Sequence, residues 1–371
     1  MRLHVNQRHA RMLELVRARG SLRVAELAEE LDVSVVTVRR DVETLADQGR
    51  LTRTHGTVTW PTGAEVEPES PAQPLAVPAA GAGGAVLGMV VPSMEHYFTE
   101  LVHGAREAAA AAGGRLVLGI SNYRPEEDPV QVRRLLDGGA QGLLLQPSWQ
   151  RGLPTPEQEQ QLLDLQVPTV LMERRIPPGG RLAGLDGVRS DHVLGSAAAV
   201  HHLADVGHKH VALLVRRDSP TAPLVREGYE AAVAARGLTR LEPIEMHPAA
   251  DPAGYDAAVK KLLHLRGVRA AIVHNDQDAI GVAQRLRAQE VRIPQDLALV
   301  AYEDELAGLT DVPLTAVAPP RRAVGRMAAE LLLERLAEGH TAAGQPVAEE
   351  DRPRRHVALL PRLRVRESTA G

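Results

Sequence analysis

"VSVVTVRRDVETLADQGRLTRTHG", residues 33–56, combines an apolar helical stripe with two adjacent arginines and a short polar hairpin. The hydroxyl of Ser34 can cap a helix that we expect to run to about Asp47. At 100° per residue, one face of this helix is apolar and carries Val35, Val38, Val42 and Leu45. We expect this face to pack on two preceding helices, predicted over residues 7–19 and 24–31.

The opposite side of the same helix is suited to binding DNA. Its guanidiniums can bind guanine or phosphate through paired hydrogen bonds, and its methyl groups can contact thymine. The hairpin, expected to turn at His55-Gly56, adds groups for the DNA backbone or the minor groove. The residues that point to this role are Val36, Thr37, Arg39, Arg40, Arg53 and His55. A solvated helix with surface ion pairs, such as Arg39 with Glu43, is the alternative.

The segment "LAEELDVSVVTVRRDVETLADQGRLTRTHG" resembles the DeoR-type winged helix–turn–helix. The recognition helix of that family reads VS-x-x-T-[IV]-RRD, and its wing reads R-x-HG. The match covers most of residues 7–58 and implies a double-stranded DNA operator as partner. The contacts implied by the resemblance are Ser34, Thr37, Arg39 and Arg40. The wing departs from the family at Thr57, because a second glycine often stands at this position. This departure affects the expected geometry of the turn in the wing.

The chain has 371 residues, the size of two or three domains. Residues 1–60 contain 10 Arg against 8 Asp and Glu, whereas the rest contains 33 basic and 39 acidic residues. A weakly basic head therefore precedes an acidic body. The absence of cysteine excludes disulfides, thiolate catalysis and cysteine-ligated metals. Because we find no signal peptide and no long apolar run, we expect a cytoplasmic protein without membrane contact.

Residues 61–84 are dense in Pro, Gly and Ala and lack periodicity, which is typical of a linker partly stiffened by proline. At its end, "GAGGAVLG" has a loose likeness to a glycine-rich phosphate loop. Its glycines precede a predicted strand instead of following one, so we interpret this stretch as linker. We therefore expect a head over residues 1–60 and a body over residues 85–371.

Strand and helix patterns alternate through the body. Apolar runs predict strands over residues 86–91, 116–120, 142–146, 169–172, 210–215, 241–246, 270–274 and 297–302. Helical patterns between them include residues 97–112, 126–137, 192–206, 224–236, 276–289 and 321–337. This alternation is typical of an α/β protein with doubly wound parallel sheets, and so many strands divide naturally into two halves.

The chain has only eight aromatic residues, so their positions are informative. Five fall at or just beyond the carboxyl ends of predicted strands: Tyr97, Phe98, Tyr123, Trp149 and Tyr302. Ligands of open parallel sheets bind at these ends. The rings therefore favour a surface on which a flat or sugar-like ligand stacks, and filling of the core by the same rings is the alternative.

The body resembles the effector domain of LacI-type repressors and the periplasmic sugar-binding proteins. The segments that carry the resemblance are "ADVGHKHVALLV", "REGYEAAVAARGL", "AIVHNDQDAIGVAQRL", "IPQDLALVAYEDE", "PLTAVAPPRRAVGRMAAELLLERL" and "LLPRLRVREST". It implies two α/β lobes joined by three crossovers, with the ligand between them. Lobe 1 would span about residues 85–188 plus 318–345 and lobe 2 about residues 189–317, with the last strand returning near the lobe boundary.

The resemblance also implies a set of ligand-binding residues. Position by position, these are Ser93, Tyr97, Phe98, Arg174, Asp191, Asn275 and Glu303. Arginine, asparagine and carboxylate groups can together donate to and accept from the adjacent hydroxyls of a sugar. The sequence departs from the family pattern at three places, which affect the expected ligand and the expected way in which ligand binding is transmitted to the head. Val225, followed by Arg226, replaces a cleft arginine; Pro319-Pro320 replaces a frequent Gln or Asp; and the linker lacks the family's interdomain helix.

These patterns predict a ligand-responsive transcription regulator, a repressor that forms a homodimer, has no enzymatic activity and uses no cofactor. The expected effector is a small carbohydrate, with a sugar phosphate or a nucleoside as the alternative. A sugar-binding transport protein would need export and would leave the head unexplained. A metal-dependent enzyme would rely on His201, His202, His208 and His210, but adjacent histidines project in different directions, so we expect no metal site.

Overall fold

The computed structural model of the chain consists of two compact units, residues 1–75 and residues 76–371. In the first unit, the structure describes residues 11–13, 15–16, 19–31, 33, 38, 41–42, 45, 51–54 and 57–59. In the second unit, it describes residues 84–94, 96–149, 152–177, 179–217, 219–246, 252–338 and 353–370.

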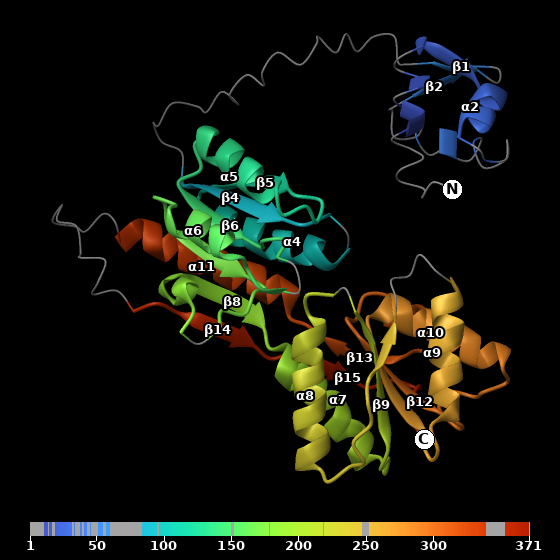
Figure 1. Ribbon diagram of the computed structural model, residues 1–371. Helices are drawn as coiled ribbons and strands as arrows, with labels where there is room; N and C mark the ends of the chain where they lie inside the picture. The colour runs from blue at the N-terminus through green and yellow to red at the C-terminus, as the bar shows by residue number, and fades with distance from the viewer. Residues whose placement is uncertain are drawn as a thin grey trace. The chain divides into compact units, whose positions relative to one another are not determined.

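The first unit contains a small antiparallel sheet and a short helix (Figure 1). β1 (Ser21–Arg23) leads directly into α2 (Val24–Glu30), and β2 (Thr52–Thr54) is followed by β3 (Thr57–Thr59). β3 lies between β1 and β2 in the sheet. Because Thr54 pairs with Thr57, β2 and β3 form the predicted hairpin. The sequence did not predict β1, because three residues are too few to show a strand period.

An apolar core holds the first unit together. Val38, Val42 and Leu45 have no exposed surface and pack with residues of the two preceding helical segments, such as Val16 and Leu27. This confirms the predicted apolar face for three of its four members, and Val35 lies outside the described residues.

Lobe 1 of the second unit is built on a six-stranded, fully parallel sheet in the order β14-β8-β7-β6-β4-β5. Its strands are β4 (Val86–Val91), β5 (Arg115–Ile120), β6 (Gly142–Leu145), β7 (Thr169–Met172), β8 (Asp186–Ser190) and β14 (His356–Leu359). Its helices are α4 (His96–Ala111), α5 (Asp128–Asp137), α6 (Pro156–Leu163), α11 (Arg321–Glu338) and a 3-10 turn, η2 (Arg181–Gly184).

Alternate residues of the lobe 1 strands face two separate cores. Leu87 and Met89 of β4 pack against α4 and α11, whereas Val90 packs on the other face, toward α5 and α6. The helices α4 and α11 cross in close contact, because a Cβ atom at Gly104 or at Gly325 would overlap backbone of the opposite helix. The sheet is therefore covered on both faces, as the strand–helix alternation predicted.

Lobe 2 contains a second six-stranded sheet, in the order β10-β9-β11-β12-β13-β15. Its strands are β9 (Val211–Arg216), β10 (Ile244–Met246), β11 (Ala270–His274), β12 (Ala298–Tyr302), β13 (Thr315–Ala318) and β15 (Arg362–Arg364). Its helices are α7 (His192–Asp205), α8 (Ala222–Ala235), α9 (Pro252–His264), α10 (Asp276–Ala288) and a 3-10 turn, η3 (Ala307–Leu309). The helices α7 and α8 cover one face and α9 and α10 the other (Figure 1).

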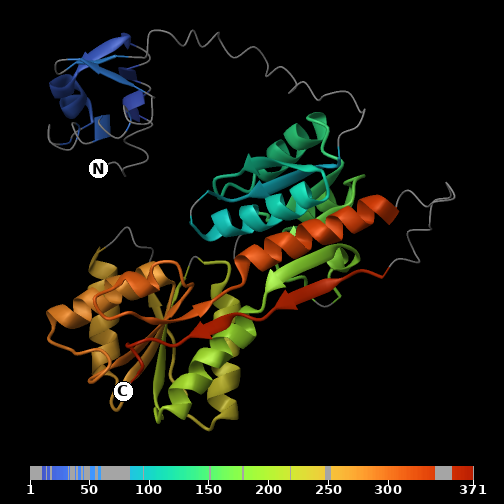
Figure 2. The same cartoon turned by 180° about the vertical axis from the view of Figure 1, so that it is seen from behind.

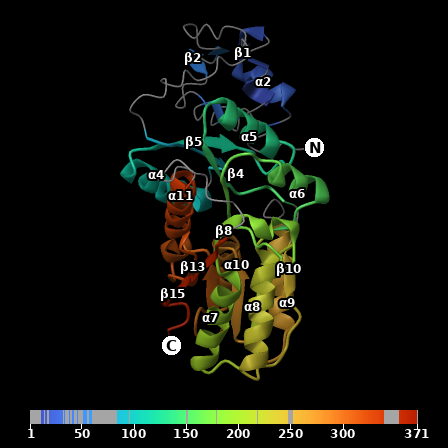
Figure 3. The ribbon, with the colours of Figure 1, turned by 90° about the vertical axis from the view of Figure 1, so that its left-hand side faces the viewer.

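The chain passes three times between the lobes: from β8 to α7, from β13 to α11, and from β14 to β15. Figure 3 shows lobe 1, with α4, α5 and α6, above lobe 2, with α7, α8 and α9. β14 and β15 follow one another along the edges of the two sheets (Figure 2). Among the described residues, no helix is long and apolar enough to cross a membrane.

One edge of the second sheet differs from the predicted parallel arrangement. β15 pairs with β13 in the antiparallel direction, with Arg362 opposite Ala318. The chain leaves lobe 1 at the carboxyl end of β14 and enters lobe 2 at the carboxyl end of β13, only two residues later. A parallel strand would need a long crossover connection, so a strand that enters at this end must run antiparallel.

Candidate ligand-binding cleft

A cleft of about 750 Å³ lies between the two lobes. Its walls are the segments that directly follow strands of both sheets, so the carboxyl ends of the two sheets face one another across it. The lining side chains are Pro92, Tyr97, Phe98, Tyr123, Pro125, Gln146, Ser148, Trp149, Glu173 and Arg174 from lobe 1, and His192, Arg216, Ser219, Pro220, Thr221, His274, Asn275, Asp276, Gln277, Glu303 and Glu305 from lobe 2.

The wall formed by lobe 1 is aromatic. The rings of Tyr97 and Phe98, at the start of α4, meet edge to face with centroids 5.3 Å apart, and the ring of Tyr123 lies 6.1 Å from that of Phe98. Tyr123 is 53% exposed, whereas Trp149 is 3% exposed. Tyr302 does not line the cleft, because it is fully buried behind His192 and His274. Four of the five predicted rings therefore reach the cleft.

Arg174 lies deep in the lobe 1 wall and holds a neighbouring loop in place. Its Nε donates to the carbonyl oxygen of Pro147 at 2.7 Å, and its Nη1 donates to the carbonyl oxygen of Glu173 at 2.8 Å. Burial lowers the pKa of the Arg174 guanidinium, and the nearby carboxylates of Glu173 and Asp128 oppose that effect. The side chain is 8% exposed, so the small part of it that reaches the cleft is fixed in position.

Glu173 connects the two lobes at the back of the cleft. Its carboxylate accepts hydrogen bonds from the backbone N–H and the hydroxyl of Ser190, at 3.0 and 2.8 Å. It also lies 3.5 Å from Nε2 of His192, whose Nδ1 is 3.1 Å from the hydroxyl of Tyr302. Burial alone would raise the pKa of Glu173, but the contacts with His192 and Ser190 outweigh it and lower that pKa.

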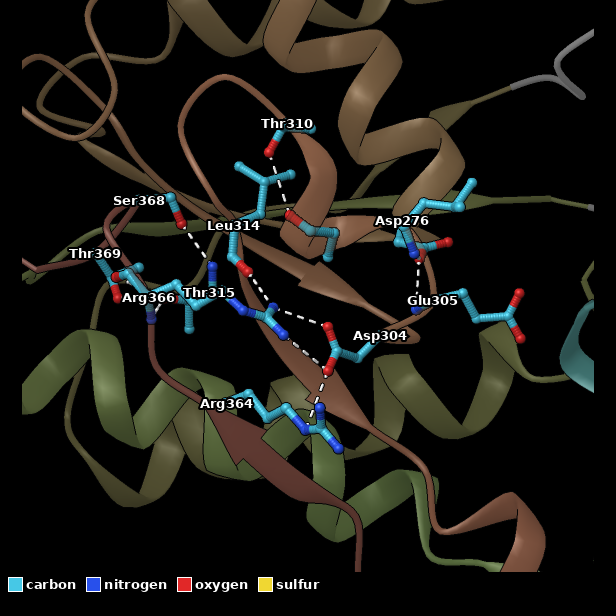
Figure 4. Close-up of polar contacts among 12 residues, drawn as sticks. Asp276, Asp304, Glu305, Thr310, Leu314, Thr315, Arg364, Arg366, Ser368 and Thr369 are labelled. Carbon is cyan, nitrogen blue, oxygen red and sulfur yellow. Dashed lines mark hydrogen bonds and ion pairs between the residues drawn. The ribbon is translucent and has the colours of Figure 1, made fainter. Parts of the chain in front are cut away.

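Asn275 and Asp276 begin α10 on the lobe 2 side. The side-chain oxygen of Asn275 accepts a hydrogen bond from the backbone N–H of Asp278 at 3.2 Å and so caps the helix. Its amide nitrogen makes no hydrogen bond to another described residue, and Asn275 lines the cleft. The buried carboxylate of Asp276 accepts from the backbone N–H groups of Glu305 and Leu306, at 2.9 and 2.6 Å (Figure 4).

Glu303 projects from the loop after β12 and is partly buried. Burial, and then the negative charge of Asp276, raise the pKa of the Glu303 carboxyl to about 8. The next residue, Asp304, is held on the opposite side by Arg364 at 3.1 Å and Arg366 at 2.8 Å, both from the C-terminal segment (Figure 4). This anchor fixes the loop, with Glu303 and Glu305 lining the cleft.

The structure brings most of the predicted ligand-binding residues together. Five of the seven line the cleft: Tyr97, Phe98, Arg174, Asn275 and Glu303. Ser93 and Asp191 are not among the lining residues. Asp191 caps α7 by accepting the backbone N–H of Leu194 at 3.0 Å. Lining a cleft does not test ligand binding, so these roles remain predictions.

The predicted DNA contacts cannot be placed in the same way. Ser34, Val36, Thr37, Arg39, Arg40 and His55 lie outside the described residues, and of Arg53 only the backbone, in β2, is described.

Val225, which stands where the family often has a cleft arginine, is fully buried in the core of lobe 2. The adjacent Arg226 donates to Glu245 at 2.9 Å, so no arginine reaches the cleft from α8.

Several cleft residues were not predicted from the sequence. These are Gln146, Glu173, His192 and Asp276. Each lies just after a strand or at the start of a helix, and this position was the only indication in the sequence that it could line a ligand site. Of the histidines considered as a metal site, His202 hydrogen bonds through Nε2 to the hydroxyl of Thr369 at 2.8 Å. Among the described residues, no group of three or more metal-binding side chains is found.

Comparison with known proteins defines the class of the chain. A DeoR-like helix-turn-helix domain matches residues 8–63, and a periplasmic binding protein-like domain matches residues 200–369. The chain thus joins a DNA-binding head to a two-lobed ligand-binding body, which is the organisation of a ligand-responsive transcription regulator.

Individual relatives specify the family. The ribose operon repressor of Escherichia coli (strain K12) is 30% identical over 264 residues, which are 68% of this chain and 76% of that protein. The transcriptional repressor PurR of Aliivibrio fischeri (strain MJ11) is 27% identical over 67% of this chain and 74% of its own length. The chain belongs to the LacI family of transcription regulators.

Solved structures agree on the fold. A LacI family transcriptional regulator from Enterococcus faecium, solved with bound ribose, has a TM-score of 0.61 and 21% sequence identity. The comparison covers 77% of this chain and 98% of that one. At this identity, the similarity establishes the two-lobed architecture and nothing about the ligand of this chain.

Proposed function

We propose that this chain is a transcriptional repressor whose affinity for operator DNA is controlled by a small carbohydrate bound in the cleft. One observation carries the proposal: an aromatic wall and a set of fixed polar groups face the same cleft from two lobes. Such a cleft lies within the usual size range of small-ligand sites. The ribose operon repressor, a relative at 30% identity, supports a sugar as the class of ligand.

The polar groups match the chemistry of a sugar. Arg174 and the amide nitrogen of Asn275 donate hydrogen bonds, whereas the carboxylate of Asp276 accepts them. With a pKa raised to about 8, Glu303 carries a proton at neutral pH and can donate to a hydroxyl or ring oxygen. The apolar face of a sugar ring can pack against Phe98 or Tyr123.

The charges around the cleft favour an uncharged sugar over a sugar phosphate. Glu305 is paired with Arg321, and Arg216 lies 3.9 Å from Asp278. Arg174 donates to backbone carbonyls and lies beside Glu173. The carboxylate of Asp276 contributes further negative charge, which would repel a phosphate dianion. We therefore expect free sugars and nucleosides to bind more tightly than the corresponding sugar phosphates.

The same proposal covers the assembly and the head. Two copies would associate so that two heads, each with residues 1–60 and contacts such as Arg39 and Arg40, bind paired half-sites with higher affinity than one head. The linker, residues 61–84, would join each head to the body, residues 85–371. Ligand binding would favour one arrangement of the lobes and so change the affinity for DNA. We also propose that the protein acts in the cytoplasm and has no enzymatic activity.

A thermal-shift screen tests the proposal. The panel contains free pentoses and hexoses, their phosphates and nucleosides, and the chain is used at full length. Stabilisation depends on the ratio of ligand concentration to the dissociation constant, so even a moderate ligand is detected. We expect a free sugar to raise the melting temperature of the wild type but not of the Asn275→Ala variant. If only phosphorylated compounds stabilise the chain, the charge argument is wrong.

A further inference from the structure

Lobe 1 contains a second pocket, of about 310 Å³, on the face of the sheet that α5 and α6 cover. We call it the side pocket. Its floor is formed by Val90 of β4 and Leu145 of β6, both almost fully buried. Other residues that line it include Pro125, Asp128, Val132, Pro147, Trp149 and Gln161. Aliphatic and proline side chains make most of its surface, so a ligand in it would be largely apolar.

The side pocket and the cleft are neighbours separated by one loop. Pro125 and Trp149 line both spaces, whereas Gln146 and Ser148 line only the cleft and Pro147 lines only the side pocket. The loop of residues 146–149, which follows β6, therefore forms the partition between them, with Trp149 at its end.

The partition is held at defined points. The carboxylate of Asp128 accepts the backbone N–H of Ser148 at 2.7 Å, and Nε of Arg174 donates to the carbonyl oxygen of Pro147 at 2.7 Å. No hydrogen bond to a described residue fixes the ring of Trp149. The loop backbone is thus anchored on both sides, and the side chain of Trp149, which lines both spaces, would have to rotate to connect them.

One atom in the partition indicates where a ligand would lie. The side-chain oxygen of Gln146, a residue that lines the cleft, is buried and accepts no hydrogen bond from the described residues. A buried acceptor without a donor is costly. A small rotation of the Gln146 side chain would let this oxygen accept from the hydroxyl of a sugar placed against the loop, which would bring the sugar ring next to Trp149.

We propose that the side pocket is a subsite for the apolar substituent, the aglycone, of a glycoside whose sugar ring lies in the cleft. The inference rests on the proposed function, because the sugar ring must bind in the cleft. The polar side of the loop would contact the sugar and its apolar side the aglycone. The volume is sufficient, since an apolar cavity of roughly 150 Å³ holds a benzene molecule. An aryl or short alkyl group therefore fits.

The test compares glycosides that differ only in their aglycone. Methyl and phenyl β-glycosides of D-ribose, D-xylose, D-glucose and D-galactose are titrated calorimetrically against the full-length chain. For a sugar that binds, we expect the phenyl glycoside to bind at least about tenfold more tightly than the methyl glycoside, because it buries an additional ring. In a Trp60→Phe variant Trp149 is the only tryptophan, and phenyl glycosides should change its emission more strongly than methyl glycosides do.

Two variants fill the side pocket without touching the cleft. Gln161→Trp adds a ring at its exposed rim on α6, and Val132→Phe enlarges a side chain of its wall on α5. Both should bind the methyl glycoside like the wild type and lose the preference for the phenyl glycoside. Glu157→Trp, an exposed position on α6 outside the pocket, controls for the added ring and should keep the preference.

The outcomes separate the inference from the proposed function. If methyl glycosides bind but the phenyl group adds no affinity, or its advantage persists in both filled variants, the side pocket is not an aglycone subsite and the sugar-binding cleft stands. If no glycoside of either kind binds, the proposed function itself is wrong, and the inference is overturned with it.

Discussion

Replacing Glu303 by glutamine should remove a large pH dependence from the stability of the protein. Glu303 lines the cleft, partly buried, close to the buried carboxylate of Asp276. Burial and that neighbouring charge raise the pKa of Glu303 from 4.5 to about 8. Glutamine has nearly the same shape and no charge, so the substitution removes the titration and keeps the packing.

The sign and size of the effect follow from proton binding. Below pH 4.5, Glu303 is protonated in the folded and the unfolded chain, and its titration contributes no difference. Between pH 4.5 and 8, only the folded chain holds the proton, so the free energy of unfolding decreases as pH rises, and above pH 8 the loss is complete. The full separation corresponds to about 5 kcal/mol at about 1.36 kcal/mol per pH unit. Because water reaches the cleft, we expect about 2–4 kcal/mol.

The assay is urea denaturation of the full-length wild type and the Glu303→Gln variant at pH 4.5, 6, 7 and 8.5. Comparing the two proteins at each pH cancels the titration of the groups that do not interact with Glu303. The variant should match the wild type near pH 4.5 and exceed its stability by about 2–4 kcal/mol at pH 8.5. Glu126→Gln, an exposed position, controls for the loss of one carboxylate. Parallel pH profiles for the Glu303→Gln variant and the wild type would refute the raised pKa.

Three further predictions concern the DNA contacts, the cleft and the core of lobe 1. Arg40→Ala should weaken specific DNA binding, measured by fluorescence anisotropy, by about 1–3 kcal/mol while sugar binding stays unchanged; unchanged affinity for the operator would exclude this residue as a base contact. Asn275→Ala should keep DNA binding and lose the response to sugar in the same assay, and a normal response would remove Asn275 from the site. Arg335→Met should lower the free energy of unfolding by about 3–5 kcal/mol, because Arg335 pairs with Asp186 at 2.7 Å in a site where both side chains are at most 5% exposed. The double variant Asp186→Leu/Arg335→Met should recover most of that loss in urea denaturation, and an additive loss would show that the ion pair is not the cause.

The strands that the sequence predicted are those with apolar runs. β4, β7 and β11 begin and end where predicted, because their Val, Leu, Ile and Ala side chains are buried on both faces of a sheet. β8, "DGVRS", was not predicted because it contains only one aliphatic side chain. Its Asp186 is buried all the same, through the ion pair with Arg335, 149 residues later in the chain. No local pattern reveals such a partner.

Other elements left a signal that could have been recognised. α6 begins with Thr155 and Pro156, and Gln158 completes a capping box with hydrogen bonds of 3.3 and 2.9 Å. Thr-Pro followed by Gln at this spacing is a sequence signature for a helix start. The edge strands β14 and β15 alternate between exposed and partly buried residues over only a few positions, which is too short for a reliable strand period.

Residues of the candidate site could be predicted from the sequence where they closely follow a strand that is itself recognisable. Tyr97, Phe98, Arg174, Asn275 and Glu303 all lie near the carboxyl end of a strand and reach the cleft. Polar contacts from Glu173 to His192 and from His192 to Tyr302 join the two lobes. Glu173 and Tyr302 are 129 positions apart in the sequence, so these contacts could be recognised only in the folded structure. The side pocket likewise depends on how α5 and α6 pack over the sheet.

The central claim is that occupancy of the cleft by a sugar controls DNA binding by the head. The most direct measurement is the fluorescence anisotropy of an operator selected from random-sequence DNA by the full-length chain. It is titrated with and without the free sugar that gives the largest thermal shift. We predict that the sugar changes the affinity for the operator at least about tenfold in the wild type, a coupling of about 1.4 kcal/mol, and leaves the Asn275→Ala variant unchanged. An operator affinity that stays the same while the sugar is bound to the wild type would contradict the account.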